Sequence, residues 1–319
     1  MDPAILKKRA FFLQKTRAFF IDNGYLEVDT PLLSPFLLPE PSLEVFRTLH
    51  LTPDGRTRES FLAPSPEIWM KRLLARGSGS IFQIGKSFRN MEFPGRHHNP
   101  EFTLLEWYTV GNDYRDSMGV MERLLQFLQE GLAGALRWSF PIPKISMKEA
   151  FARYAGLDLD ELLEEEPLRR AASRAGIRIS RDDGWEELFH KLFLMKVEPS
   201  LADYPAVFLC DYPAAIRTTA KTAAGYAERW EIYMRGVEVA NCYTEETDPQ
   251  ELKRFLREEA ERKKACRVPH PVDWEFAELF PKGFPACSGA ALGMDRLFML
   301  ICGANSIDEC ILFPFSEMS

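Results

Sequence analysis

Residues 88–108 have the sequence FRNMEFPGRHHNPEFTLLEWY, and this stretch decides how the chain folds. Alternating side chains predict strands at 81–91 and 101–110, with a polar turn at 93–100 between them. One face of the second strand carries four side chains, those of Phe102, Leu104, Glu106 and Tyr108. A carboxylate on such an apolar face is costly unless a cation satisfies it. Glu106 therefore requires either an internal Arg or Lys, or the amine of a ligand.

The sequence before this hairpin predicts two helices and a strand. Asp2-Pro3 suits the start of a helix, and Asn23-Gly24 suits its end. Residues 25–30 alternate like a strand that Pro31 closes, whereas the proline-rich residues 34–60 predict irregular structure. Ser65-Pro66-Glu67 begins a second helix, which reaches Arg76. Ordinary helix-start chemistry accounts for these three residues without any substrate.

The sequence after the hairpin alternates between helical and extended segments. Apolar residues at helical spacing predict a helix around 120–132, and Ser146 with Glu149 forms a capping box that opens a helical stretch to about residue 195. The later elements are strands within 206–241, a helix from Asp248-Pro249 to about 267, a strand at 286–292 and a helix at 293–302. Strands often follow one another without intervening helices, so we expect a largely antiparallel sheet.

Composition excludes several classes of protein. The 319 residues are 46% hydrophobic, which is enough for a substantial core and rules out a disordered chain. No apolar stretch approaches the roughly 20 residues of a membrane span, and nothing resembles a signal peptide. The six cysteines include no CxxC pair, so zinc or disulfides are not expected and a cytoplasmic location fits. A net charge of −7 argues against a wide nucleic-acid interface.

Two further segments carry residues suited to phosphate chemistry. In Gly236–Asn241, Glu238 precedes Glu245 by seven residues, and paired carboxylates suit Mg²⁺ together with substrate phosphates. Solvated acidic residues explain the same spacing equally simply. In the second segment, small residues at 289–291 allow a ligand to approach the backbone, and Arg296 follows in the first turn of a helix. An anion bound at that helix start would favour Arg296, whereas pairing with Asp295 is the structural alternative.

These segments together resemble the three ordered motifs of class II aminoacyl-tRNA synthetases. Gly24–Pro31 resembles motif 1, Phe88–Tyr108 motif 2 and Gly289–Leu297 motif 3. The blocks HNPEFT (98–103) and EVAN (238–241) resemble the lysyl branch, and the likeness extends over about residues 5–315. Only 23 residues precede Gly24, too few for an anticodon-binding OB-fold. The chain therefore resembles the elongation factor P–(R)-β-lysine ligases, a lysyl-tRNA synthetase-like family.

The resemblance implies the fold and the domain organisation. It implies an α+β class II catalytic fold, with a mainly antiparallel sheet of about six strands flanked by helices. Residues 1–319 would form a single catalytic domain with a helical insertion at about 140–200 and no anticodon-binding domain. It further implies a homodimer built through motif 1.

The resemblance also implies an activity. A lysine-type amino acid, lysine or (R)-β-lysine, would be activated with ATP and Mg²⁺ as an aminoacyl-adenylate and transferred to a lysine side chain of elongation factor P. We expect no stable tRNA binding. Two alternatives are a lysyl-tRNA synthetase paralogue that charges tRNA and a non-catalytic synthetase-like protein that senses amino acids. The phosphate-handling residues argue against the sensor, because a sensor has no need of them.

The family motifs imply specific roles for residues of this sequence. Arg89 would hold the α-phosphate and Arg296 the γ-phosphate, and Glu238 and Glu245 would carry Mg²⁺; these four are the expected catalytic residues. Adenine would lie between Phe102 and Arg296. The expected nucleotide-binding residues are Arg89, Asn90, Met91, Glu92, His98, Asn99, Phe102, Glu238, Val239, Gly293 and Arg296. The expected amino-acid pocket consists of Ser65, Pro66, Glu67, Glu106, Tyr108, Asn241, Glu245 and Ala291.

The chain departs from the family pattern at two places. Met91 follows Asn90 where motif 2 usually has Glu, so Glu92 would have to supply that carboxylate. Residues 36–46 do not match the Thr-Val-Thr-Asp-like stretch of some members, which leaves the choice of lysine isomer open. Ala291 stands where lysyl-tRNA synthetases have Gly, and its methyl group would reshape the pocket near the substrate amine.

Overall fold

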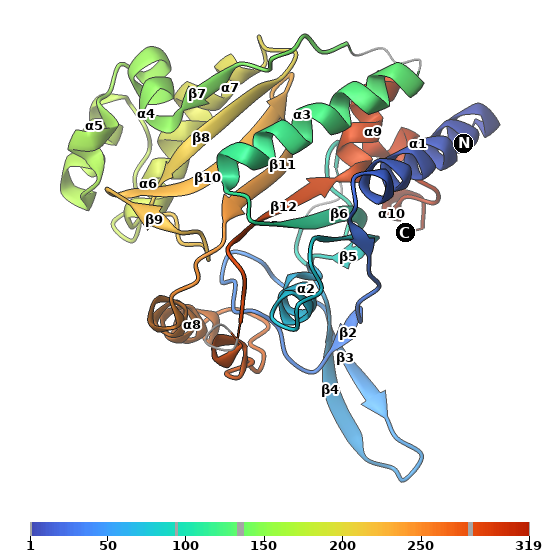
Figure 1. Cartoon of the computed structure of the whole chain (residues 1–319). Coiled ribbons are helices and arrows are strands. Elements are labelled where there is room, and N and C mark those ends of the chain that lie inside the picture. The colour runs from blue at the N-terminus through green and yellow to red at the C-terminus, as the bar shows by residue number, and fades with distance from the viewer. Residues whose placement is uncertain (1, 93–94, 133–136, 280–282, 319) are drawn as a thin grey trace.

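A nine-stranded, mainly antiparallel sheet forms the centre of the molecule (Figure 1). The computed structural model describes residues 2–92, 95–132, 137–279 and 283–318, so residues 93 and 94 of the predicted turn lie outside the described part. The strand order is β1-β5-β6-β12-β11-β10-β8-β7, with β9 paired to β10. Only β1 with β5 and β7 with β8 run parallel. The α+β class II fold is thus confirmed, with more strands than the six expected.

The strands of this sheet vary widely in length. Their bounds are β1 Leu26–Glu27, β5 Ile81–Phe88, β6 Glu101–Val110, β7 Lys144–Ser146, β8 Val207–Pro213, β9 Thr222–Ala223, β10 Tyr226–Met234, β11 Val237–Thr244 and β12 Cys287–Gly293. The predicted first strand is shorter than residues 25–30. Beyond it, Val28 still donates its N–H to the carbonyl of Phe82 in β5 (2.9 Å), whereas Thr30 donates its N–H to the side chain of Gln83 (3.0 Å).

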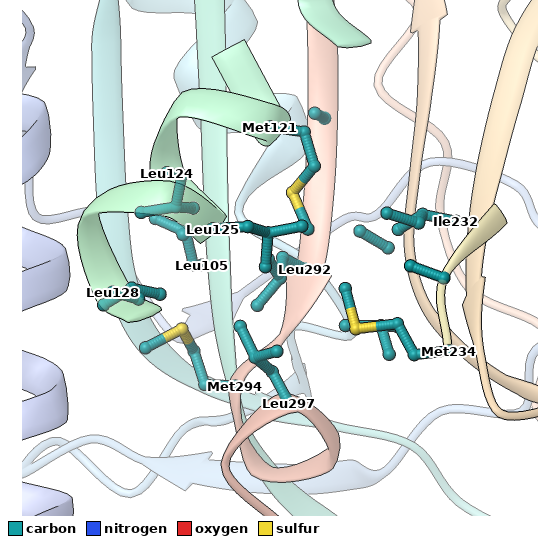
Figure 2. Close-up of a cluster of buried hydrophobic side chains, with 14 of the residues drawn as sticks. Leu105, Met121, Leu124, Leu125, Leu128, Ile232, Met234, Leu292, Met294 and Leu297 are labelled. Carbon is teal, nitrogen blue, oxygen red and sulfur yellow. The ribbon is translucent and has the colours of Figure 1, made fainter. Parts of the chain in front are cut away.

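Three helices cover one face of the sheet, namely α1 (Pro3–Asp22), α3 (Tyr114–Gly131) and α9 (Met294–Cys302). The predicted cap of α1 is present, since the side chain of Asp2 accepts from the N–H of Ala4 (2.8 Å). Figure 2 shows the resulting core, in which leucines of α3 meet Leu105 and Leu292 of the sheet. The odd-numbered side chains of β6 therefore point into the core, and the even-numbered ones point to the opposite face.

Most of the segment between β6 and β8 is helical. It contains α4 (Met147–Ala150), a π-helix (Phe151–Ala155), a 3₁₀-helix (Leu159–Leu162), α5 (Glu165–Arg174), α6 (Trp185–Leu192), a second π-helix (Phe193–Val197) and α7 (Glu198–Leu201). The predicted capping box is present at its start, because the Ser146 side chain accepts from the Glu149 N–H (3.2 Å) and Glu149 accepts from the Ser146 N–H (2.8 Å). These helices have their own apolar core against β8.

The opposite face of the sheet is flanked by α2 (Glu67–Leu74) and α8 (Pro249–Lys263). Beside them lies a small sheet of β2 (Leu33–Ser34), β4 (Thr57–Leu62) and β3 (Arg47–Leu51), and Figure 1 shows its hairpin projecting from the body. The prediction of irregular structure across 34–60 therefore holds for residues 35–46 and is wrong for the hairpin of β3 and β4. The Pro-Asp-Gly turn at 53–55 is a hairpin signal that the surrounding prolines obscured.

The chain ends with short helical turns. A 3₁₀-turn at Phe276–Glu278 packs near α8, a second at Ile307–Glu309 follows α9, and α10 (Phe315–Met318) ends the described part. All six cysteines are free thiols. Among the described residues, no helix combines the length and the apolar character needed to cross a bilayer.

Candidate active site

Strand register assembles the site on the face of the sheet that α3 leaves open. One row across four neighbouring strands contains Glu106, Ala291, Asn241 and Glu231 as successive partners. The next row contains Tyr108, Gly289, Tyr243 and Arg229. Since side chains alternate along each strand, both rows project to the same side. Residues separated by up to about 185 positions are thereby brought together without any sequence motif linking them.

The first cavity over these rows has a volume of about 380 Å³, and we call it the acidic cavity because five glutamates line it alongside four arginines. Ser65 and Glu67 at the start of α2 line it, together with Glu106 and Tyr108 of β6. Glu106 is 3% exposed and accepts hydrogen bonds from the hydroxyls of Ser65 (2.7 Å) and Tyr108 (2.8 Å). Burial and the nearby Glu67 raise the pKa of Glu106 to about 7. Among the described residues Glu106 has no ion-pair partner, so its carboxylate is available to an amine.

Lys71 is the internal cation of this cavity. Its ammonium contacts Glu67 (2.5 Å), Glu245 (2.6 Å) and the hydroxyl of Thr219 (3.0 Å), and it is 1% exposed. Burial disfavours its charge, but Glu245 and Glu67 outweigh that effect and raise the pKa of Lys71 well above its ordinary value. Burial raises the pKa of Glu245 to about 8, and its Oε1 has no hydrogen-bond partner in the described part of the chain. The cluster thus holds more acidic groups than cations.

A second cavity of about 230 Å³ adjoins the first and is lined by cationic and aromatic groups. Arg296 donates to the carbonyls of Glu238 (3.0 Å) and His97 (3.2 Å), and its guanidinium lies 2.8 Å from Nε2 of His98. Burial and Arg296 lower the pKa of His98, which favours the neutral ring there. Asp295 does not pair with Arg296, because it binds Arg9 (2.5 Å) instead. Within the residues that the structure describes, the carboxylate nearest to the Arg296 guanidinium is therefore that of Glu238 (3.9 Å).

The two cavities meet at Arg89. Both are lined by Arg89, Leu104, Asn241 and Ala291. The Arg89 guanidinium lies 5.2 Å from the ring centroid of Phe102 and 3.8 Å from Glu92. A ligand in the acidic cavity and a ligand in the second cavity would therefore approach each other beside one arginine.

The structure does not bring Glu238 and Glu245 together. They lie at the two ends of β11, and seven residues of strand span roughly 23 Å. Glu245 is committed to Lys71, whereas Glu238 borders the second cavity. Glu231 of β10 is a charged neighbour of Glu238, and burial and this neighbour raise the pKa of Glu238 to about 7. Glu238 lines the second cavity, whereas Glu231 pairs with Arg229 (2.6 Å). One or two carboxylates plus phosphate oxygens are the usual ligands of Mg²⁺, so this pair fits that ion.

The other predicted site residues fall into two groups. Glu92, His98, Asn99, Phe102, Val239 and Gly293 line the second cavity as expected. Asn90, Met91 and Pro66 line neither cavity. Asn90 donates its side-chain amide to the carbonyl of Val45 (3.4 Å) and its N–H to the carbonyl of Glu44 (2.8 Å). Met91 has a positive φ of 59° and is 53% exposed. Pro66 serves the start of α2, where the Ser65 hydroxyl accepts from the Glu67 N–H (3.0 Å).

Sequence reasoning missed several residues of the site. Lys71 follows Glu67 by four positions in a predicted helix, and this spacing could have indicated the ion pair. Arg229 and Glu231 alternate on one strand face and form an ion pair (2.6 Å), a signal that period-two reading could have found. Tyr243 and Thr219 offered no signal, because only the tertiary arrangement brings their hydroxyls to Glu67 (3.4 Å each).

Comparisons with known proteins identify the family to which the chain belongs. The profile of the class II tRNA synthetases (D, K and N) matches residues 3–317. The elongation factor P–(R)-β-lysine ligase of Vibrio atlanticus is 39% identical, with 97% of this chain and 95% of that protein covered. The ligase of the same name from Yersinia enterocolitica is 39% identical over 98% of this chain and 95% of that protein. A homologue from Aquifex aeolicus is 37% identical over 93% and 95%.

Proposed function

Because the chain belongs to the class II tRNA synthetases and is an ATP-dependent ligase of that family, we propose that it activates a lysine-type amino acid with ATP and transfers it to elongation factor P. The observation that carries the proposal is the pair of adjoining cavities that share Arg89. The acidic cavity suits the amines of a diamino acid, and the cavity beside Arg296 suits a nucleotide with its phosphates.

In the proposed first step, a carboxylate oxygen of the amino acid attacks the α-phosphorus of ATP. The bond from that phosphorus to the bridging oxygen breaks, and pyrophosphate leaves. The chain supplies no nucleophile, so positioning and charge neutralisation account for catalysis. Arg89, at the junction of the cavities, would neutralise the α-phosphate, and Arg296 would bind the outer phosphates. Glu238 and Glu231 would hold Mg²⁺, which neutralises phosphate charge when bound.

In the proposed second step, an uncharged amine of the acceptor attacks the activated carbonyl. The bond between carbonyl carbon and phosphate oxygen breaks, AMP leaves, and the amine loses a proton as the amide forms. Glu106 would hold an amine of the substrate through both steps. Ala291 lines both cavities beside Glu106, so its methyl group limits how closely the amino acid can approach the sheet. We propose on this ground that the preferred isomer is (R)-β-lysine.

We also propose a homodimer that uses the edge of the sheet at β1. The support is an exposed edge strand next to exposed apolar side chains, since Leu26 is 55% and Ile21 52% exposed. Unpaired edges of this kind are usually covered in the native assembly.

The experiment that tests the proposal is pyrophosphate exchange followed by an acceptor assay. With ATP and Mg²⁺, lysine or (R)-β-lysine should support exchange of labelled pyrophosphate into ATP. Mass spectrometry should then detect one aminoacyl addition on elongation factor P. Exchange with neither amino acid would overturn the proposal.

A further inference from the structure

The segment Leu38–Leu43 forms one wall of the acidic cavity. It is held in place by the buried Lys263 of α8, whose ammonium donates to the carbonyls of Glu40 (3.2 Å) and Leu43 (2.5 Å). Prolines flank Glu40 on both sides and restrict its backbone. The carboxylate of Glu40 is therefore presented to the cavity by an anchored segment.

Most acidic groups that line this cavity already have a cationic partner. Glu67 pairs with Lys71 (2.5 Å). Arg262 lies 3.2 Å from Glu186 and 3.0 Å from Glu259. Each of these carboxylates therefore has a cation within ion-pair distance.

Two lining carboxylates lack such a partner. Glu106 accepts hydrogen bonds only from neutral hydroxyls. The side chain of Glu40 makes no hydrogen bond and no ion pair with any residue in 2–92, 95–132, 137–279 or 283–318. Because unpaired carboxylates in a partly buried site are costly, two ammonium groups would satisfy the cavity.

The position of Glu40 indicates which amine it would meet. Its charged neighbours include Glu67 and Arg89, and Arg89 stands at the junction with the second cavity. We infer that Glu40 is a specificity-determining residue that receives the amine closer to the reacting carboxylate, while Glu106 receives the distal amine. This inference rests on the proposed function and deepens it, because it defines the substrate as a diamino acid.

The electrostatics of the cavity agree with this assignment. Burial and the neighbouring Glu67 raise the pKa of Glu40 to about 7, as expected of a carboxylate that lacks a cation. A bound ammonium group would lower that pKa. The family resemblance did not include Glu40 among the residues expected to form the amino-acid pocket.

The test compares Glu40→Gln with wild type by calorimetric titration of three compounds, lysine, (R)-β-lysine and 6-aminohexanoate. The last keeps the carboxylate and the distal amine but lacks the other amine. Glu40→Gln should weaken binding of the preferred diamino acid at least tenfold and leave 6-aminohexanoate unchanged. Glu106→Gln should weaken both. Glu165→Gln removes the same charge from a residue of α5 that pairs with Arg169 (2.9 Å) and lines neither cavity, so it should leave the binding of both compounds unchanged.

Unchanged binding of the diamino acid by Glu40→Gln, or an equal loss for 6-aminohexanoate, would overturn the inference. Failure of wild-type protein to bind any diamino acid would instead overturn the proposed function, and the inference with it. A melting temperature equal to that of wild type will show that Glu40→Gln is folded.

Discussion

Arg296 is the residue on which the nucleotide assignment depends most directly. Its guanidinium is held by two carbonyls and His98, yet its nearest carboxylate is 3.9 Å away. A cation fixed by neutral groups keeps its charge available for an anion.

Replacing Arg296 with Ala should therefore lower the rate of pyrophosphate exchange by about 10²–10³, the usual cost of losing one fixed charge that stabilises a transition state. Circular dichroism should report an intact fold. The exposed Arg58 of the projecting hairpin provides a matched control, and Arg58→Ala should exchange normally. Normal exchange by Arg296→Ala would exclude the assignment.

Glu106 makes amino-acid binding depend on pH. Burial and the neighbouring Glu67 raise its pKa to about 7. Below that pH the carboxyl is protonated and cannot pair with an ammonium group; above it the ion pair forms and a proton is released. Affinity for 6-aminohexanoate, whose single amine would meet Glu106 alone, should therefore rise about tenfold from pH 6 to pH 8. In Glu106→Gln this dependence should become shallower, which titration in buffers of different ionisation enthalpy will measure. An identical pH profile in the variant would contradict the role of Glu106.

At the scale of elements, β11 connects the two halves of the site. Glu238 near its start borders the nucleotide cavity, and Glu245 just after its end belongs to the cluster around Lys71. A spacing of seven residues along an extended strand separates functions that the same spacing on a helix would have joined.

Variants at the two ends of β11 should consequently differ in kinetics. Glu238→Gln should raise the Mg²⁺ concentration needed for exchange and leave the KM for the amino acid unchanged. Glu245→Gln should raise the KM for the amino acid and leave the Mg²⁺ requirement unchanged, because it disturbs the partner of Lys71. Initial rates measured against each substrate in turn will separate the effects. If both variants instead required more Mg²⁺, the result would support the earlier prediction that Glu238 and Glu245 bind the metal together.

Strand β12 approaches the amino-acid cluster so closely that only glycine fits at one position. A Cβ on Gly289 would lie 2.4 Å from Oε1 of Glu245 and 2.5 Å from Cε1 of Tyr108. Gly289→Ala should displace one of these side chains, cost about 1–3 kcal/mol in stability and raise the KM for the amino acid more than that for ATP. Gly119→Ala in α3, where only the flexible Arg123 is within 3.4 Å, is the control. Wild-type kinetics in Gly289→Ala would show that the cluster tolerates displacement.

For the whole molecule, local chemistry predicted the elements better than their assembly. The cap at Asp2 and the period of two in β6 depend on neighbours in sequence, and both predictions were confirmed. The ion pair of Lys71 with Glu245 joins residues 174 positions apart, so no local pattern could reveal it. The family resemblance supplied the cavity residues because it encodes such distant contacts, but it led us to pair Glu238 with Glu245 and to overlook Glu231.

The choice of acceptor is also decided at the scale of the molecule. A net charge of −7 provides little attraction for a polyanion, and phosphate contacts supply much of the affinity of tRNA-binding proteins. Glu186 and Arg262 line the acidic cavity as a partly exposed ion pair, and such a mixed pair suits a protein segment bearing a lysine better than a nucleic-acid backbone. In a competition with elongation factor P and tRNA at equal concentration, we expect one aminoacyl group on the protein and none on the tRNA. Heat-inactivated enzyme provides the background for both acceptors. Both acceptors would attack the same activated carbonyl, so only docking distinguishes them. Aminoacylated tRNA together with unmodified elongation factor P would therefore identify the chain as a synthetase that charges tRNA.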